Sequence, residues 1–527
     1  MQRFKPVILF HTIKYLRFKQ IFYRIFYLVR NRIVGKNQSK KLVKKSTRFV
    51  WQEQIAYPNA YQKNNTFTFL NRSKEFGPKI DWNYMEFGTL WAYNLNYFDF
   101  LNAKDISVEE SLYLIGDYVK SESYLKYGKD SYPISLRGIN WIKFLSRNNI
   151  SNNEIDQSLY NHYQILYHNL EYHLLGNHLL ENAFSLFFAS YYFDDGMFYE
   201  KANKLLKEEL DEQILKDGAH FELSPMYHQI ILYRLLDCIN LVRICGIKKD
   251  NILSLLEEKA RAMLLWLEAV TFSNGNVPMV NDCAYGISFT SNELRKYAES
   301  LGITCNEGEL LDSGYRMFRK TDYEIFVDMG NIGPKYQPGH AHSDTFSFEL
   351  YVRQQPVIVD TGTSTYEKNK TRQMERETSS HNTVKIGNQE QSQVWGGFRV
   401  AKRAEVFDLS ENSNSVMARH NGYKNIGVVH TRKITAEDSE VKIEDELSKS
   451  INTPQVAFFH FHPTVKTLEI DQNRVKLRKE GITILFGNDV VEIQQQNFEY
   501  AKGFNKTEKS LKIAVSFHKS LKTSIIV

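Results

Sequence analysis

Apolar residues follow two different periods along this chain of 527 residues. From about Trp51 to Leu301 they recur at helical spacing, in long segments rich in Leu, Tyr and Phe. Helices are predicted over residues 106–120, 155–192, 197–214, 225–245 and 251–270. A helical half of this length can form a bundle, a solenoid or a toroid, and the pattern alone does not choose among them.

The second half has the pattern of an all-β structure. From Gly314 onward the chain shows short alternating runs, for example over residues 324–328, 346–352, 357–359 and 441–445. We therefore predict a helical domain over residues 51–310 and a β-sandwich over residues 311–527. No low-complexity linker separates them, so a sizeable interface between the two is expected.

The first 50 residues form a basic arm. They hold 14 Lys and Arg residues and no Asp or Glu, so the net charge of +6 belongs to this arm. Apolar residues recur among the basic ones at helical spacing, at Phe10, Ile13, Phe18, Ile21, Phe22, Ile25 and Leu28. The pattern is typical of an amphipathic helix on an anionic membrane, or of a helix docked on its own domain. The first alternative predicts peripheral membrane contact, and no nucleic-acid partner is expected.

Targeting signals are scarce. Basic residues interrupt the apolar run of the arm, so a cleavable secretion signal is not expected. No segment approaches the roughly 18 consecutive apolar residues of a membrane-spanning helix.

The cysteines lack the close spacing of a zinc or redox motif and are predicted to be free thiols: Cys238, Cys245, Cys283 and Cys305. We expect a cytoplasmic or peripheral membrane location rather than secretion.

The first group of candidate residues is Gly339-His-Ala-His-Ser-Asp344. If a strand begins at His340, then His340, His342 and Asp344 share one face, because strand side chains alternate. Buried imidazoles and carboxylates need partners, and two imidazoles with a carboxylate suit zinc. Asp360 and His381 follow downstream as further donors. The alternative is a set of hydrogen-bonded strand histidines without metal.

The second group lies on a predicted helix. Asn177 and His178 stand four and three residues before Glu181, so all three share a helix face. Glu181 is then able to orient the amide or the imidazole. Ordinary hydrogen bonding along a helix face is the alternative.

The third group is a helix start. Ser224 followed by Pro225 matches an N-cap with proline at the first helical position, which places Tyr227 in the first turn. The positive end of a helix favours a phenolate. The alternative role for Tyr227 is packing.

Aromatic and polar residues also alternate within the helical half. Trp91, Tyr93, Asn94 and Arg137 are suited to stacking sugars and binding their hydroxyls. They are equally consistent with a buried aromatic core in which the polar atoms of the side chains form hydrogen bonds within the protein.

Taken together, these groups resemble the heparinase II/III family of polysaccharide lyases, and the resemblance covers nearly the whole chain after the arm. It is carried by the segments at residues 90–99, 134–143, 176–182, 224–228, 340–344, 359–362 and 381–384. The resemblance implies an α+β multidomain fold, in which an incomplete (α/α) toroid is followed by an antiparallel β-sandwich.

The resemblance also implies a reaction, namely β-elimination next to a uronic acid in an acidic polysaccharide. Removing the C5 proton leaves an enolate-like dianion unless the carboxylate is neutralised. By resemblance Asn177 and His178 neutralise it, with Glu181 orienting them. Tyr227 is the acid, and the base is Tyr227 itself or His340.

The remaining roles also come from the resemblance. His342, Asp360 and His381 match a structural zinc site of the heparinase II branch, where zinc would fix His340 beside the cleft. Arg376, Arg399 and Arg403 are candidate contacts for carboxylate or sulfate, because guanidinium groups suit planar anions.

Three competing functions stay open from the sequence. A glycoside hydrolase would use carboxylates among Glu181, Glu222 and Asp282. A zinc hydrolase would be built on His340, His342 and Asp344. A non-catalytic glycan-binding protein on the same scaffold is the third alternative.

Overall fold

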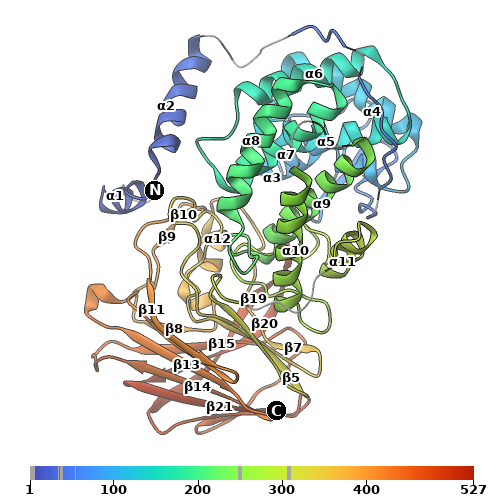
Figure 1. Cartoon of the computed structure of the whole chain (residues 1–527). Helices are drawn as coiled ribbons and strands as arrows, with labels where there is room; N and C mark the ends of the chain where they lie inside the picture. Colours follow the sequence, from blue (N-terminus) through green and yellow to red (C-terminus); the bar gives the residue numbers. More distant parts are fainter. Residues whose placement is uncertain are drawn as a thin grey trace.

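The structure is a computed structural model that describes residues 6–33, 35, 40–44, 46–53, 55–246, 248, 252–304 and 310–527. A helical lobe lies above a lobe of antiparallel sheets, and the last helix of the first lobe ends at Ser300, before the first strand of the second begins at Tyr315 (Figure 1). The predicted domain boundary at residue 310 lies between these two elements. No helix among the described residues is long and apolar enough to cross a membrane.

The helical lobe follows the predicted pattern, except that residues 155–192 form two helices separated by a turn rather than one. Its helices are α3 (Thr89–Tyr97), α4 (Val108–Ser121), α5 (Ser131–Arg147), α6 (Asn153–His168), α7 (Gly176–Tyr192), α8 (Gly196–Gln213), α9 (Pro225–Cys245), α10 (Ile252–Val270) and α11 (Ser291–Ser300). A small sheet that the sequence pattern did not indicate stands at its edge, formed by β1 (Tyr61–Gln62), β2 (Thr66–Phe69) and β3 (Arg72–Glu75).

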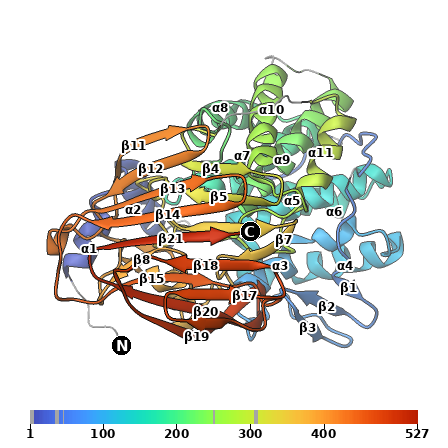
Figure 2. The same cartoon turned by 90° about the horizontal axis from the view of Figure 1, so that it is seen from below.

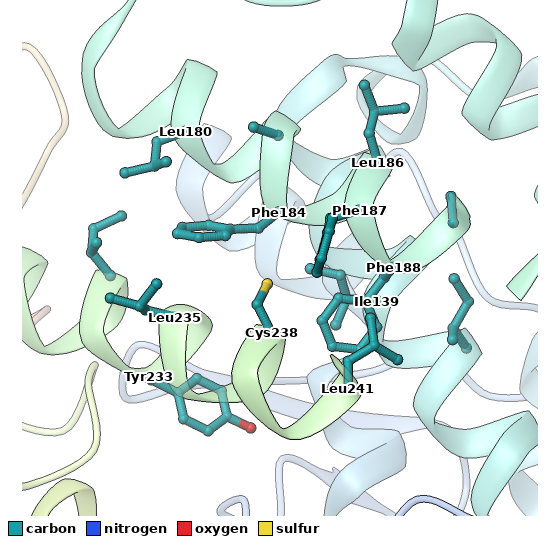
Figure 3. Packing of buried hydrophobic residues seen from close by; sticks show 14 of the residues in the cluster. Ile139, Leu180, Phe184, Leu186, Phe187, Phe188, Tyr233, Leu235, Cys238 and Leu241 are labelled. Carbon is teal, nitrogen blue, oxygen red and sulfur yellow. The ribbon is translucent and has the colours of Figure 1, made fainter. Parts of the chain in front are cut away.

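Helix α7 lies at the centre of this lobe and packs against α5, α8 and α9. Figure 3 shows Phe184 and Phe187 of α7 against Leu235 and Leu241 of α9. Nearly every position of α7 is buried, so the helix cannot shift without opening the core. The first turn of α7 is therefore held rigidly where it reaches the junction of the lobes.

The β lobe consists mainly of three antiparallel sheets. One has the order β4 (Tyr315–Arg319), β5 (Tyr323–Asp328), β6 (Phe348–Val352) and β7 (Gln355–Ile358). The strands of the largest sheet lie side by side in Figure 2. Their order is β11 (Val406–Asn412), β12 (Ser415–His420), β13 (His430–Ala436), β14 (Glu440–Leu447), β21 (Ser520–Ile526), β18 (Ile482–Phe486), β17 (Arg474–Leu477) and β16 (Glu469–Asp471).

The third sheet has the order β19 (Val490–Gly503), β20 (Lys506–Phe517), β15 (Gln455–His460) and β8 (Val384–Ile386). Strands such as β13 bury alternate residues in a common apolar core, as the predicted sandwich requires. Two short elements, the pair β9 (Val394–Trp395) and β10 (Arg399–Val400) and the helix α12 (Lys370–Glu375), lie toward the helical lobe (Figure 1).

One predicted strand is wrong at its start. Residues 340–347 are irregular, and the strand begins only at Phe348. Phe346 has a φ of +70°, a left-handed conformation that no regular strand adopts. His340, His342 and Asp344 therefore do not share a strand face.

The basic arm forms two helices, α1 (Pro6–Ile13) and α2 (Phe18–Ile33), beside the junction of the two lobes (Figure 1). The arm contacts both lobes. The Gln20 amide donates to the carbonyl oxygens of Leu174 and Tyr336, one from each lobe, and Trp395 Nε1 donates to Thr12 Oγ1 at 3.1 Å. The arm is therefore docked on its own protein, as the second alternative predicted.

Candidate active site

A cleft of about 910 Å³ lies where the arm, the helical lobe and the β lobe meet. The arm contributes residues from Leu9 to Ile25, and the helical lobe contributes the first turns of α7 and α9. Loops of the β lobe complete it, around His340, Tyr366 and Arg399. The cleft therefore joins residues that are separated by hundreds of positions in the sequence.

Tyr227 and His340 face each other in this cleft. Their ring centroids are 3.9 Å apart, with the ring planes at 32°. Tyr227 sits in the first turn of α9, where Ser224 Oγ caps its backbone N–H at 3.4 Å, as the Ser-Pro pattern predicted. Its hydroxyl lies 3.2 Å from that of Tyr366. Burial raises the pKa of Tyr227 well above its ordinary value, and the neighbouring Tyr366 raises it further. This phenol is therefore protonated in the resting protein.

Asp282 fixes the ring of His340. His340 Nδ1 lies 2.9 Å from Asp282 Oδ2, and His342 Nε2 lies 2.9 Å from the other oxygen. Arg372 donates to both oxygens of the same carboxylate. Burial alone would raise the pKa of Asp282, but Arg372 and the two imidazoles hold it well below its ordinary value. An ionised Asp282 favours the tautomer of His340 with its proton on Nδ1, while Nε2 lies 3.3 Å from the Asn177 amide nitrogen and 3.4 Å from Glu222 Oε2.

Asn177 is held by Glu222. The Asn177 backbone N–H donates to Glu222 Oε1 at 3.0 Å, and its side-chain amide donates to Oε2 at 2.8 Å. The same amide nitrogen lies 3.3 Å from His340 Nε2. The preceding Gly176 has a φ of +59°, and a Cβ there would meet Glu222 Oε1 at 2.5 Å. A glycine is therefore required for Glu222 to reach the start of α7.

His178 is held by Glu171, at 3.0 Å between Nδ1 and Oε1. The second Glu171 oxygen accepts from the amide of Asn182 at 3.0 Å, which fixes the carboxylate. Burial lowers the pKa of His178, but Glu171, together with Glu222 and Glu181, more than offsets this, so the net pKa is raised above its ordinary value. His178 thus favours the imidazolium form at the edge of the cleft.

These contacts correct the predicted role of Glu181. Its Oε1 accepts from Arg234 Nε at 2.8 Å, and only 1% of the residue is exposed. Helical spacing placed it near Asn177 and His178, but α9 offers it a cationic partner instead. Glu181 belongs to a buried ion pair, and Glu222 and Glu171 orient the two residues.

Three other predicted substrate contacts are also wrong. Arg137 is fully buried and donates to the carbonyl oxygens of Asn96 and Gly128. Trp91 is fully buried, with Nε1 bonded to the Arg72 carbonyl. Arg376 is fully buried and donates to the Ala341 carbonyl, so it supports the loop that carries His340.

The cleft retains three of the predicted contacts, Tyr93, Arg399 and Arg403. Tyr93 lines the wall and donates its hydroxyl to Asp130 Oδ2 at 3.0 Å, and Arg399 lines the rim. Asn94 lies one position further along α3, is not part of the lining and donates to the Leu90 carbonyl.

Most of the charged lining residues are basic. Glu367 is the acidic side chain, and the basic ones are Arg24, Lys335, Lys368, Arg399 and Arg403. Arg403 is largely buried, and burial lowers its pKa to about 10, which leaves it cationic at neutral pH. A polyanion would be attracted to this cleft.

The predicted zinc ligands lie close together without forming a complete metal site. His381 Nδ1 lies 2.7 Å from Asp360 Oδ2, and the rings of His342 and His381 are 5.3 Å apart between centroids. Among the described residues, no group of three His, Cys, Asp or Glu side chains is arranged to hold a metal ion. His342 Nδ1 and His381 Nε2 are nevertheless buried without a hydrogen-bond partner. Imidazole and carboxylate are ligand types that suit zinc, but these side chains are not placed around a common point where an ion would bind.

Two alternative sites from the sequence find no support. In the hydrolase alternative, Glu222 is committed to Asn177 and Asp282 to Arg372, so neither carboxylate is available as acid or base. In the zinc hydrolase alternative, His340 and His342 both turn toward Asp282 rather than toward Asp344.

Sequence reasoning missed Tyr366 and Arg24, which line the cleft, and Glu171, which holds His178. Glu171 lies in the turn before α7, and Tyr366 lies in the segment between β7 and α12. Neither has a periodic or spacing signal, because each contact depends on how distant segments pack.

Comparisons with known proteins find matches over most of the chain. A family model described as "Heparinase II/III N-terminus" matches residues 131–304, and one described as "Heparinase II/III-like, C-terminal" matches residues 306–527. A heparin-sulfate lyase of Bacteroides stercoris is 22% identical over 269 residues, which cover 46% of this chain and 39% of the relative. A heparin-sulfate lyase of Pedobacter heparinus is 25% identical over 210 residues, which cover 35% and 31%. The aligned regions thus span well under half the length of these curated relatives.

Solved structures show the same architecture. A crystal structure of heparinase III superposes with a TM-score of 0.63 at 16% identity, covering 99% of this chain and 93% of that one. A mutant heparan sulfate lyase from Pedobacter heparinus gives 0.58 at 17% identity, covering 88% and 81%. The predicted fold is confirmed: a helical toroid is followed by an antiparallel β-sandwich.

Proposed function

Because the chain belongs to the heparinase II/III family, we propose that it is a polysaccharide lyase that cleaves a uronic-acid-containing polysaccharide by β-elimination. The observation that carries the proposal is the meeting of Tyr227, His340 and Asn177 in one basic cleft. Each of the three suits one of the tasks that this elimination requires.

The first task is to neutralise the uronate carboxylate. Abstraction of the C5 proton puts negative charge onto that carboxylate, so groups that bind the charged form lower the barrier. The Asn177 amide and the His178 imidazolium stand next to each other on the first turn of α7. Glu222 and Glu171 hold them in place before substrate arrives. Such preorganised groups cost little reorganisation during the reaction.

The second task is proton transfer. His340 lines the cleft with Nδ1 engaged by Asp282, which suits a base that takes the C5 proton at Nε2. Tyr227 carries its proton in the resting protein, which suits an acid that protonates the departing O4. For the opposite C5 epimer, Tyr227 would serve as both base and acid.

The substrate class follows from charge. The basic rim favours a polyanion, and heparin-type glycosaminoglycans are the first substrates to test, since the curated relatives are named heparin-sulfate lyases. Mass spectrometry of the products separates the lyase from a hydrolase. Elimination gives fragments whose summed mass equals that of the intact chain, whereas hydrolysis adds one water for each cut. Products that contain the added water would overturn the proposal.

Zinc at His342, Asp360 and His381 stays a separate proposal. Its support is the pair of unpartnered ring nitrogens on His342 and His381. A zinc ion there would tie the segment before β8 to the loop that carries His340, with no part in proton transfer. Elemental analysis of the purified protein tests it, with His381→Ala as the variant that should lose the metal. A native protein without zinc would contradict it.

Membrane contact of the arm is also a separate proposal. It depends on residues outside the catalytic groups, and the lyase assignment does not require it.

A further inference from the structure

Helix α2 is docked on the protein by its polar and aromatic face. Gln20 is buried and donates to both lobes, and Tyr23 lies against Tyr172 with 4.5 Å between ring centroids. Tyr27 donates its hydroxyl to the Leu170 carbonyl at 2.7 Å, and Arg30 donates to the His168 carbonyl. These four residues recur every three or four positions, so they define one face of the helix.

A second face of α2 is apolar and exposed to solvent. It carries Phe18, Phe22, Phe26, Val29 and Ile33, which are 42–81% exposed. The three phenylalanines stack in a row, with centroids 6.2 and 5.9 Å apart. A surface helix ordinarily buries its apolar stripe on the core and exposes its polar one. This helix does the reverse, and a contiguous exposed apolar face marks an interaction surface.

The charges around this apolar face have a single sign. Lys14 and Arg32 are exposed on or beside α2, whereas Arg24 lines the cleft, and residues 1–50 include no Asp or Glu. Arg17 does not count toward this set, because it pairs with Glu212 of α8. The surface is therefore an apolar ridge flanked by cations, without an acidic group of its own.

We infer that this outward face of α2 docks onto an anionic lipid surface. Phenylalanine, valine and isoleucine would enter the boundary between headgroups and acyl chains, and the flanking cations would bind the headgroups. The helix would lie in the plane of the membrane, because no described helix is suited to span it. A second copy of the chain is a poorer occupant, since it would bring two cationic arms together without any acidic residue to pair them.

This docking would place the cleft at the membrane. Ile21, Arg24 and Ile25 of the same helix line the cleft, while the ridge faces outward. A polyanionic chain at the lipid surface would then reach the cleft past Arg24. The inference concerns location and does not depend on which reaction the cleft catalyses.

Vesicle sedimentation tests the inference with the full chain. The protein is mixed with phosphatidylcholine vesicles with and without phosphatidylglycerol, and the bound fraction is measured at low and high salt. Binding is expected only with phosphatidylglycerol and is expected to fall as salt rises. The variant Phe18→Ser/Phe22→Ser/Phe26→Ser should lose binding. The matched control Met197→Ser/Leu311→Ser/Leu409→Ser, which alters similarly exposed residues outside the arm, should bind like the native protein.

A charge variant keeps the test decisive if the triple phenylalanine variant does not fold. Lys14→Gln/Arg32→Gln should weaken binding by about fivefold for each charge removed. Native protein that stays in the supernatant with phosphatidylglycerol vesicles would overturn the inference. So would a folded phenylalanine variant that binds as well as the native protein, or a dimer that depends on these phenylalanines in the absence of vesicle binding.

Discussion

The imidazole of His340 lies face to face with the phenol of Tyr227, with 3.9 Å between their ring centroids. His340 comes from a loop of the β lobe and Tyr227 from the first turn of α9, so the pair exists only when the two lobes are joined. Asp282 on one side and Tyr366 on the other fix the pair. The proposed proton transfers depend on this contact between lobes.

Replacing Asn177 by alanine removes the amide proposed to bind the uronate carboxylate in the transition state. We expect kcat to fall by about 100- to 1,000-fold with little change in KM, because the interaction strengthens as charge develops. Steady-state kinetics on a cleaved polysaccharide measures both constants. A variant with normal kcat and a raised KM would show that Asn177 only binds the ground state.

Replacing Glu171 by glutamine removes the main cause that raises the pKa of His178. A raised pKa keeps His178 protonated to higher pH, so activity that needs the imidazolium is retained below that pKa and lost as the pH rises through it. In Glu171→Gln the alkaline fall in kcat/KM should begin at lower pH. The pH profile of kcat/KM checks this. A profile that keeps its alkaline limb unchanged would contradict a charged role for His178.

Replacing Arg24 by alanine removes a cation from the cleft wall. We expect a rise in KM for a polyanionic substrate, largest at low salt, and an unchanged kcat. Arg32→Ala is the matched control, because Arg32 lies on the same helix outside the cleft lining. Equal effects of the two substitutions would indicate general charge attraction rather than a contact at Arg24.

Replacing Glu181 by alanine tests whether this residue stabilises the fold through Arg234 rather than orienting Asn177 and His178. Its carboxylate pairs with buried Arg234, and removing one partner of a buried ion pair costs about 3–5 kcal/mol. We expect a clear drop in the thermal unfolding midpoint. Undiminished thermal stability together with a large loss of kcat would restore the orienting role that helical spacing suggested.

The sequence pattern predicted the two halves well, because hydrophobic periodicity reports burial directly. The Ser224-Pro225 helix start was also predictable, since capping is a local interaction. The strand assumed to begin at His340 was wrong, because the positive φ of Phe346 is a local conformation that alternation cannot reveal.

The candidate site was predictable only in part. The motifs identified Asn177, His178, Tyr227 and His340, and the structure brings all four to one cleft. Their partners were not predictable: Glu222 reaches Asn177 across 45 residues, and Asp282 reaches His340 across 58. Spacing suggested Glu181 instead, since it reports neighbours within a helix and not the partners that other helices supply. The same is true of the arm. Its pattern predicted a helix with an apolar and a polar face, but it did not predict which face contacts the rest of the protein.

Tyr227 and His340 are proposed to carry out β-elimination on a uronic-acid polysaccharide. Elimination leaves a conjugated unsaturated uronate, which absorbs in the ultraviolet. The most direct measurement is the rise in ultraviolet absorbance when purified protein acts on a panel that begins with heparin-type glycosaminoglycans. We predict a rise with at least one polymer, reduced by about 100- to 10,000-fold in both Tyr227→Phe and His340→Ala. No rise with any uronic-acid polymer, or a rise that both variants retain in full, would contradict the claim.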